Sequence, residues 1–181
     1  MTYFRDLSDY KYFHGTRQVG TKNVGWLEQN HEFERTVPSE DALDCLWSFC
    51  AISVIQTRGI HACDLCAPPQ SVFAARHGIR LRLGSSEIRV FSKEGAVYAA
   101  PNFIYHYIRT HHYKPPDEFL RAVSKGSRPP NQKYFERLKK LGLEWSMTPS
   151  PPVSQSRFKF VKVEGKVQRV EVQSSAYLDE S

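Results

Sequence analysis

The chain has 181 residues, a mass of 20.9 kDa and a formal net charge of +6. With 40% hydrophobic and 24% charged residues, its composition excludes a disordered tail, a collagen and a coiled-coil rod. No apolar run approaches the roughly 18 residues that cross a bilayer, and Arg5, Asp6 and Asp9 interrupt the position of a secretory signal. We therefore expect a globular cytoplasmic protein that makes no membrane contact.

The N-terminal quarter predicts loops followed by one helix. Residues 3–26 are rich in aromatic side chains without a regular period, which indicates loops and short strands over the core. After Pro38, Ser39 is a candidate helix cap. An apolar stripe at helical spacing follows, formed by Leu43, Leu46, Trp47, Cys50 and Val54.

The middle of the chain predicts a small antiparallel sheet and three further helices. Alternating apolar residues predict a three-stranded meander from segments 79–83, 87–91 and 96–100. Helices are expected from Pro101 to about His112, from Pro116 to Gly126 and from about Asn131 to Leu141. These elements define an α+β fold with a small antiparallel sheet flanked by helices.

The C-terminal segment reads as a linker and an appendage. Residues 146–156 contain three prolines and four serines, a composition that favours an extended linker. Residues 157–172 alternate as a β-hairpin with Lys and Arg on its exposed face. We expect an α+β domain over residues 1–145, a linker over 146–156 and a basic hairpin within 157–173.

The sharpest chemical signal is the run His61-x-Cys63-x-x-Cys66. Two thiolates at this spacing bind one tetrahedral zinc ion from a tight turn. A redox pair is the alternative, but such motifs open a helix, and Pro68-Pro69 argues against a helix here. The third interpretation is two inert buried cysteines.

A second half-site lies at the end of the helix that follows the predicted meander, where His106 and His111 are five residues apart. At 100° per residue, the two imidazoles are separated by about 140° in a regular helix. They therefore share a metal only if the last turn is distorted or the helix ends before His111. His61 is the substitute ligand if either helical histidine points away.

Four protein ligands around one ion predict a structural Zn²⁺, because a catalytic zinc keeps one position open for water or substrate. The predicted metal ligands are therefore Cys63, Cys66 and two of His61, His106 and His111. This ligand count argues against an enzyme. The alternative is a zinc-dependent hydrolase or nuclease with three protein ligands and Glu87 or Asp64 as general base.

The positive charge is concentrated in the C-terminal third. Residues 1–120 contain 13 Lys and Arg against 13 Asp and Glu, whereas residues 121–181 contain 12 against 6. Phosphate backbones attract such clusters of cations. Nucleic-acid binding through residues 121–172 is therefore a second alternative function.

Four segments taken together resemble a bacterial family of small domains of unknown function over residues 3–125. They are Tyr3-Phe4-x-Asp6-Leu7-Ser8-x-Tyr10, Asn23-Val24-Gly25-Trp26-Leu27, Arg58-Gly59-x-His61-x-Cys63-x-x-Cys66 and His106-Tyr107-x-x-x-His111-x-Tyr113-x-Pro115-Pro116-x-Glu118-Phe119. The resemblance implies a compact bacterial cytoplasmic domain in which the HxCxxC and HYxxxH residues are functional or hold a metal. It implies no activity.

The first hypothesis for function is therefore a zinc-stabilised module that binds a protein partner. The family type and the small size suggest an immunity or accessory protein of a bacterial conflict system. The residues identify neither the partner nor the oligomeric state.

Overall fold

The computed structural model describes residues 2–12, 20–57, 59–147, 157–163 and 166–172. Contacts between residues divide the chain into two units, Met1–Pro149 and Ser150–Ser181. The first unit combines four helices with two sheets, which confirms the predicted α+β class. No helix among the described residues combines the length and apolar composition that a membrane span requires.

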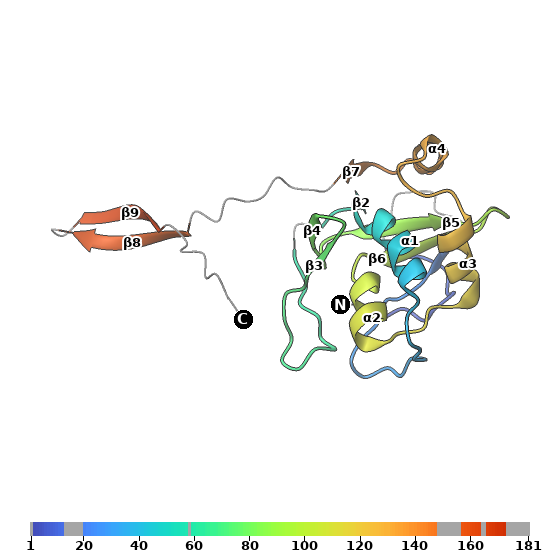
Figure 1. The fold of residues 1–181 in the computed structure, drawn as a ribbon, viewed down its shortest axis with the longest axis horizontal. Helices are drawn as coiled ribbons and strands as arrows, with labels where there is room; N and C mark the ends of the chain where they lie inside the picture. The colour runs from blue at the N-terminus through green and yellow to red at the C-terminus, as the bar shows by residue number, and fades with distance from the viewer. Residues whose placement is uncertain (1, 13–19, 58, 148–156, 164–165, 173–181) are drawn as a thin grey trace. The chain divides into compact units, whose positions relative to one another are not determined.

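The main sheet of the first unit has five strands in the order β1-β6-β5-β2-β7 (Figure 1). Its strands are β1 (Thr21–Asn23), β2 (Ile52–Val54), β5 (Glu87–Phe91), β6 (Val97–Pro101) and β7 (Trp145–Met147). β1 runs parallel to β6, and the other neighbours are antiparallel. The sheet is therefore mixed, with an N-terminal strand added beside the β5–β6 hairpin.

The predicted meander is correct in its β5–β6 pair and wrong in its first strand. β4 (Ile79–Arg82) pairs with β3 (Phe73–Arg76) in a separate two-stranded sheet. The two are joined by His77 and Gly78, both at positive φ, which is the conformation of a two-residue hairpin turn. Because this tight turn closes β4 onto the segment before it, β4 is not a neighbour of β5.

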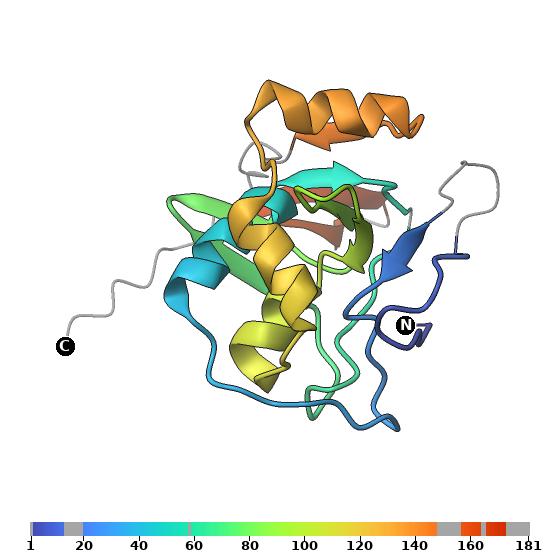
Figure 2. The same cartoon turned by 90° about the vertical axis from the view of Figure 1, so that its right-hand side faces the viewer.

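The four helices lie near their predicted positions. They are α1 (Glu40–Cys50), α2 (Ile104–His111), α3 (Asp117–Lys125) and α4 (Gln132–Lys140). α1 and α3 both contact β5, and α2 packs against α1, so these three helices gather on one side of the sheet (Figure 2). Figure 2 also shows α4 beside β7.

Two predicted helix boundaries are wrong. The apolar stripe of the first helix was extended to Val54, but α1 ends at Cys50 and Val54 is the last residue of β2. The residues Ile52 and Val54 are β-branched and are buried between β5 and β7, where a strand suits them better than a helix. Pro101 ends β6 and does not start a helix.

The predicted linker overlaps the sheet at its first two residues. Ser146 and Met147 belong to β7, in which Ser146 pairs with Ser53 and Met147 with Ile52. The rest of that prediction, residues 148–156, lies outside the described residues. In the second unit, β8 (Arg157–Val163) and β9 (Lys166–Val172) form an antiparallel pair, which confirms the predicted hairpin.

The centre of β5 buries an ion pair. Arg89 is completely buried, and its Nη1 donates to Glu87 Oε2 at 2.6 Å. The Tyr10 hydroxyl donates to the same carboxylate at 2.9 Å, and the Arg89 guanidinium lies over the Tyr10 ring. Burial raises the pKa of Glu87, whereas Arg89 and Tyr10 counteract the rise. This network ties the N-terminal segment to the sheet.

Removing one member of this pair should destabilise the fold strongly. We expect Arg89→Met to lower the free energy of unfolding by about 3–5 kcal/mol, because it leaves the buried Glu87 carboxylate without its counter-charge. Chemical denaturation measures the change. The double variant Glu87→Gln with Arg89→Met should recover part of the loss, and a double variant no more stable than the single one would contradict this role.

Candidate metal centre

The segment before β3 forms a closed turn that presents two thiols. Cys63 donates its backbone N–H to the carbonyl of Gln70 at 2.9 Å, which closes the loop. The Cys63 thiol in turn accepts backbone hydrogen bonds from Leu65 and Cys66. Cys63 is fully buried and Cys66 partly exposed. Main-chain contacts within the loop therefore help to hold the first sulfur in place.

The end of α2 is wider than a regular helical turn. The N–H of His112 bonds to the carbonyl of Tyr107, five residues back, and the N–H of Tyr113 bonds to the same carbonyl at 3.0 Å. A bond that spans five residues is the pattern of a π-turn. His112 itself adopts the left-handed conformation, with φ at 58°. The helix thus ends immediately after His111.

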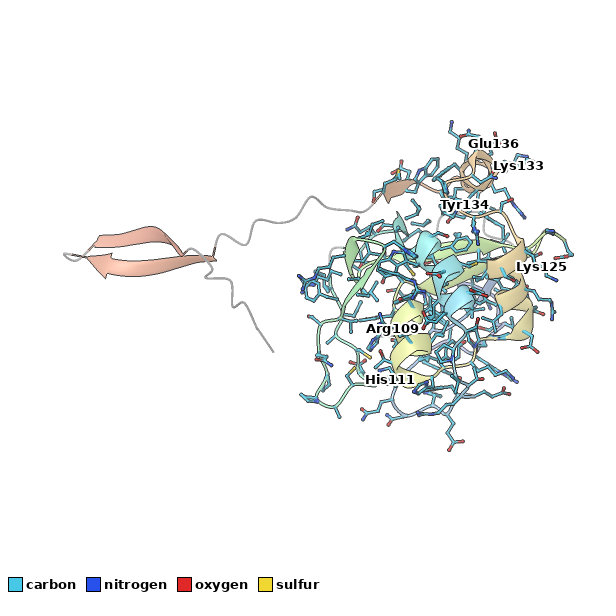
Figure 3. All side chains as sticks on the ribbon, viewed as in Figure 1. Arg109, His111, Lys125, Lys133, Tyr134 and Glu136 are labelled. Carbon is cyan, nitrogen blue, oxygen red and sulfur yellow. The ribbon has the colours of Figure 1, made fainter. Side chains whose placement is uncertain are left out.

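This widened turn resolves the angular problem posed by two histidines five residues apart. A turn closed over five residues brings positions i and i+5 toward the same side of the helix. The Nε2 atoms of His106 and His111 lie 3.1 Å apart. His106 is buried and His111 is partly exposed at the last turn of the helix (Figure 3).

The two half-sites meet. Cys63 Sγ lies 3.4 Å from His111 Nε2, and Cys66 Sγ lies 3.4 Å from His106 Nε2 and 3.5 Å from His111 Nε2. All four ligand atoms lie within 4.8 Å of one another. Tetrahedral zinc with ordinary bond lengths sets its ligand atoms about 3.3–3.8 Å apart. The three sulfur–nitrogen separations given above lie in this range, and the widest pair, up to 4.8 Å apart, would have to close by about 1 Å around an ion, so the cluster has the donor set and nearly the size of a tetrahedral site.

Burial favours the neutral forms of Cys63, His106 and His111. It raises the pKa of the Cys63 thiol to about 11, although the N–H groups of Cys66 and Leu65 oppose the rise. Burial and the neighbouring His111 lower the pKa of His106 to about 4. A neutral imidazole offers its lone pair to a metal, and a bound cation would displace the thiol proton.

The structure separates the other candidate residues from this cluster. His61 is exposed, and its backbone N–H bonds to the carbonyl of Gly84, so it does not join the four ligands. Glu87, considered as a general base, is held in the buried pair with Arg89. Cys45 accepts a hydrogen bond from Arg128, and Cys50 is buried in the core.

The sequence indicated that the last turn of the helix must be distorted or end early for both histidines to share a metal, but it did not identify the backbone hydrogen bonds that shape the loop and the helix end. The hydrogen bonds to the Cys63 sulfur depend on the conformation of the loop. The CxxC spacing is compatible with that conformation but does not specify it. The widened turn includes the left-handed conformation of His112, which is uncommon for non-glycine residues although histidine adopts it more often than most. The one available signal was Pro115-Pro116, which requires the helix to end shortly before it.

The fold and the cluster together define a small α+β domain with a buried Cys₂His₂ arrangement able to hold a metal ion. The chain belongs to the family described as Domain of unknown function (DUF7919), whose model matches residues 2–124. The match includes all four ligands and ends within α3. No curated protein and no solved structure matches the chain.

The conformation of His112 leads to a stability prediction. A side chain in the left-handed region costs about 1–2 kcal/mol, and a β-branched one fits worst. We expect His112→Gly to be more stable than His112→Val by about 1–2 kcal/mol in thermal or chemical unfolding at equal metal load. Equal stability of the two variants would contradict the helix end described here.

Proposed function

We propose that Cys63, Cys66, His106 and His111 bind one zinc ion that stabilises the domain. The observation that carries this proposal is the convergence of two thiols and two imidazoles within 4.8 Å. Two sulfur and two nitrogen ligands in tetrahedral arrangement are typical of zinc. Four protein ligands fill its coordination shell, so the ion has a structural role and no place for a substrate.

The zinc ion would hold together two segments that the chain separates by forty residues. The loop that carries the two thiols, residues 63–70, which we call the thiol turn, is closed by the pairing of Cys63 with Gln70. It continues into β3, and the N–H of Leu83 donates to the carbonyl of Val72 at the start of the hairpin. The far end of the β3–β4 hairpin is fixed to α1 by Arg76, which contacts Asp44 and Glu40. The metal thus supports one end of the β3–β4 hairpin, and the ion pairs of Arg76 with α1 hold the other end.

We propose that this hairpin is the binding surface of a protein-interaction module. Phe73 on β3 is 51% exposed, and the guanidinium groups of Arg80 and Arg82 lie 4.9 and 5.5 Å from its ring centroid. Exposed aromatic and arginine side chains dominate binding energy at protein interfaces. A partner of complementary chemistry would present an apolar socket bordered by acidic side chains.

A zinc-dependent hydrolase is the second candidate, and one feature favours it. A cavity of about 560 Å³ borders His111 and is also lined by Glu32 and Arg35. Catalysis there requires His111 to leave the ion and water to take its place. X-ray absorption at the zinc edge separates the two functions through the outer-shell scattering of the imidazole rings: two sulfurs with two imidazoles support the structural role, and two sulfurs with one imidazole and one further light atom support the hydrolase.

Zinc content tests the proposal directly. We expect the purified protein to contain one zinc ion per chain and the Cys63→Ser and Cys66→Ser variants to contain almost none, because a hydroxyl is a poor zinc ligand. Elemental analysis measures this. Cys45→Ser is the matched control, since it makes the same exchange outside the cluster and should retain the ion. Equal zinc in all four proteins would refute the site.

Chelation distinguishes a structural ion from a peripheral one. Structural zinc contributes an apparent binding free energy of about 10–16 kcal/mol, which is comparable to the whole stability of a domain. EDTA should therefore lower the melting temperature of the wild-type protein and of Cys45→Ser. It should leave that of Cys63→Ser unchanged. An unchanged wild-type melting curve after the zinc is removed would contradict the structural role.

The interaction surface is tested by photocrosslinking in cells. We expect benzoylphenylalanine in place of Phe73 to form a discrete protein adduct that disappears when Arg80→Glu and Arg82→Glu are added, because inverted charge repels an acidic partner. The matched control adds Arg109→Glu and Arg121→Glu, two exposed sites elsewhere, and should keep the adduct. An adduct that persists in the first variant, or is lost in both, would overturn the assignment.

A further inference from the structure

Both parts of the C-terminal third are basic, but the part within the first unit carries the larger net charge, +5 over residues 121–147 against +3 over the hairpin residues 157–172. Residues 121–147 contain seven Lys and Arg against two Asp and Glu, whereas residues 148–181 contain five against four. The nucleic-acid alternative covered residues 121–172 as one basic surface. The charge distribution favours the part that includes α3 and α4.

Four of these seven cations, together with Lys93, surround a cavity of about 640 Å³ at the junction of α3 and α4. Its basic residues are Lys93, Lys125, Arg128, Lys133 and Arg137. Figure 3 shows Lys125 at the end of α3 and Lys133 on α4, on the same side of the unit. The remaining lining residues are serine, glycine, proline and asparagine, so no carboxylate faces the cavity.

Among the described residues, none of these five cations forms an ion pair with a carboxylate. The nearby acids do not line the cavity. Glu94, next to Lys93, accepts hydrogen bonds from Ser92 and from its own backbone, and Glu136 is exposed on α4. Five cations around one concave space repel one another, and that repulsion is relieved by a bound anion.

The fold holds this arrangement in place. A side chain at Gly126 would place its Cβ 2.0 Å from the carbonyl oxygen of Phe91, so only glycine allows α3 to end this close to β5. Arg137 is half buried, donates to the carbonyl of Ser92 at 2.9 Å and lies over the Phe91 ring. Its guanidinium is therefore positioned before any ligand arrives, which lowers the entropic cost of binding.

The chemistry of the cavity favours phosphate over a nucleobase. Stacking on bases requires an aromatic side chain, and none lines this space. The five positive charges around the cavity exceed the negative charge of a single phosphate group. We propose that the α3–α4 cavity binds closely spaced phosphate groups, supplied either by a small polyphosphate compound or by the backbone of a nucleic acid.

Two probes and two charge-matched variants test this site in the full-length protein. The probes are inorganic triphosphate and a mixed-sequence DNA duplex, titrated by calorimetry at low salt. We expect Lys125→Gln with Lys133→Gln to weaken binding at least about tenfold. The control, Lys139→Gln with Lys140→Gln, removes the same charge from exposed residues of α4 outside the cavity and should change affinity less than about threefold.

Each outcome bears on the proposal. If the Lys125 and Lys133 variant weakens binding of triphosphate alone, with the control unaffected, the cavity binds a small polyphosphate. If the same difference between the variants is seen with the duplex, the cavity binds the nucleic-acid backbone. Equal losses in the two variants would show a general charge effect and overturn the cavity. Absence of binding by the wild-type protein to both probes would also overturn it. Exposed Lys→Gln changes should keep the melting temperature, which checks that the variants fold.

Discussion

The convergence of four ligand atoms between a loop and a helix end is the constraint on which the rest of the domain depends. Two thiols and two imidazoles lie within 4.8 Å of one another, and burial raises the pKa of Cys63 and lowers that of His106. Polar groups removed from water need compensating interactions, and a metal ion supplies four strong ones at once. Among the described residues, no backbone hydrogen bond outside the helices and strands joins this loop to α2, so the ion would add to the apolar packing of Cys63 and Leu65 against the core.

The loop that would hold the ion is also connected to the exposed β3–β4 hairpin. The thiol turn is continuous with β3, and its backbone pairing at Gln70 sets the direction in which the hairpin leaves the domain. At the other end, Arg76 and His77 bond to Asp44 on α1. A hairpin of two short strands is only marginally stable alone. Metal and ion pair together would make it a rigid support for the exposed Phe73.

The helices and the CxxC pair were predictable because their signals are local. Proline, acidic first turns and glycine or asparagine at the ends define α3 and α4 within a few residues, and CxxC requires no knowledge of the fold. The sheet order was not predictable, because β1 joins β6 in parallel across more than seventy residues. β3, with the sequence Phe-Ala-Ala-Arg, has no alternation, and only the His77-Gly78 turn indicated it.

The buried ion pair was the feature that the sequence predicted least well. Glu87 and Arg89 occupy alternate positions of β5, a pattern that usually faces solvent, yet every residue of that strand is buried. The N-terminal segment covers them and supplies the Tyr10 hydroxyl. A carboxylate that looks available as a base in the sequence is therefore committed to an ion pair, which removes one of the two groups, Glu87 and Asp64, considered as a general base.

The metal cluster and the basic cavity are built from different parts of the first unit. The family match ends at residue 124, so it contains all four ligands but stops before Lys125 and the whole of α4. The cavity is joined to the sheet through Phe91 and Ser92 at the end of β5, whereas the ligands belong to the thiol turn and α2. The two sites therefore have separate supports: the cluster joins the loop of residues 63–70 to α2, and the cavity depends on the packing of α3 and α4 beside the end of β5.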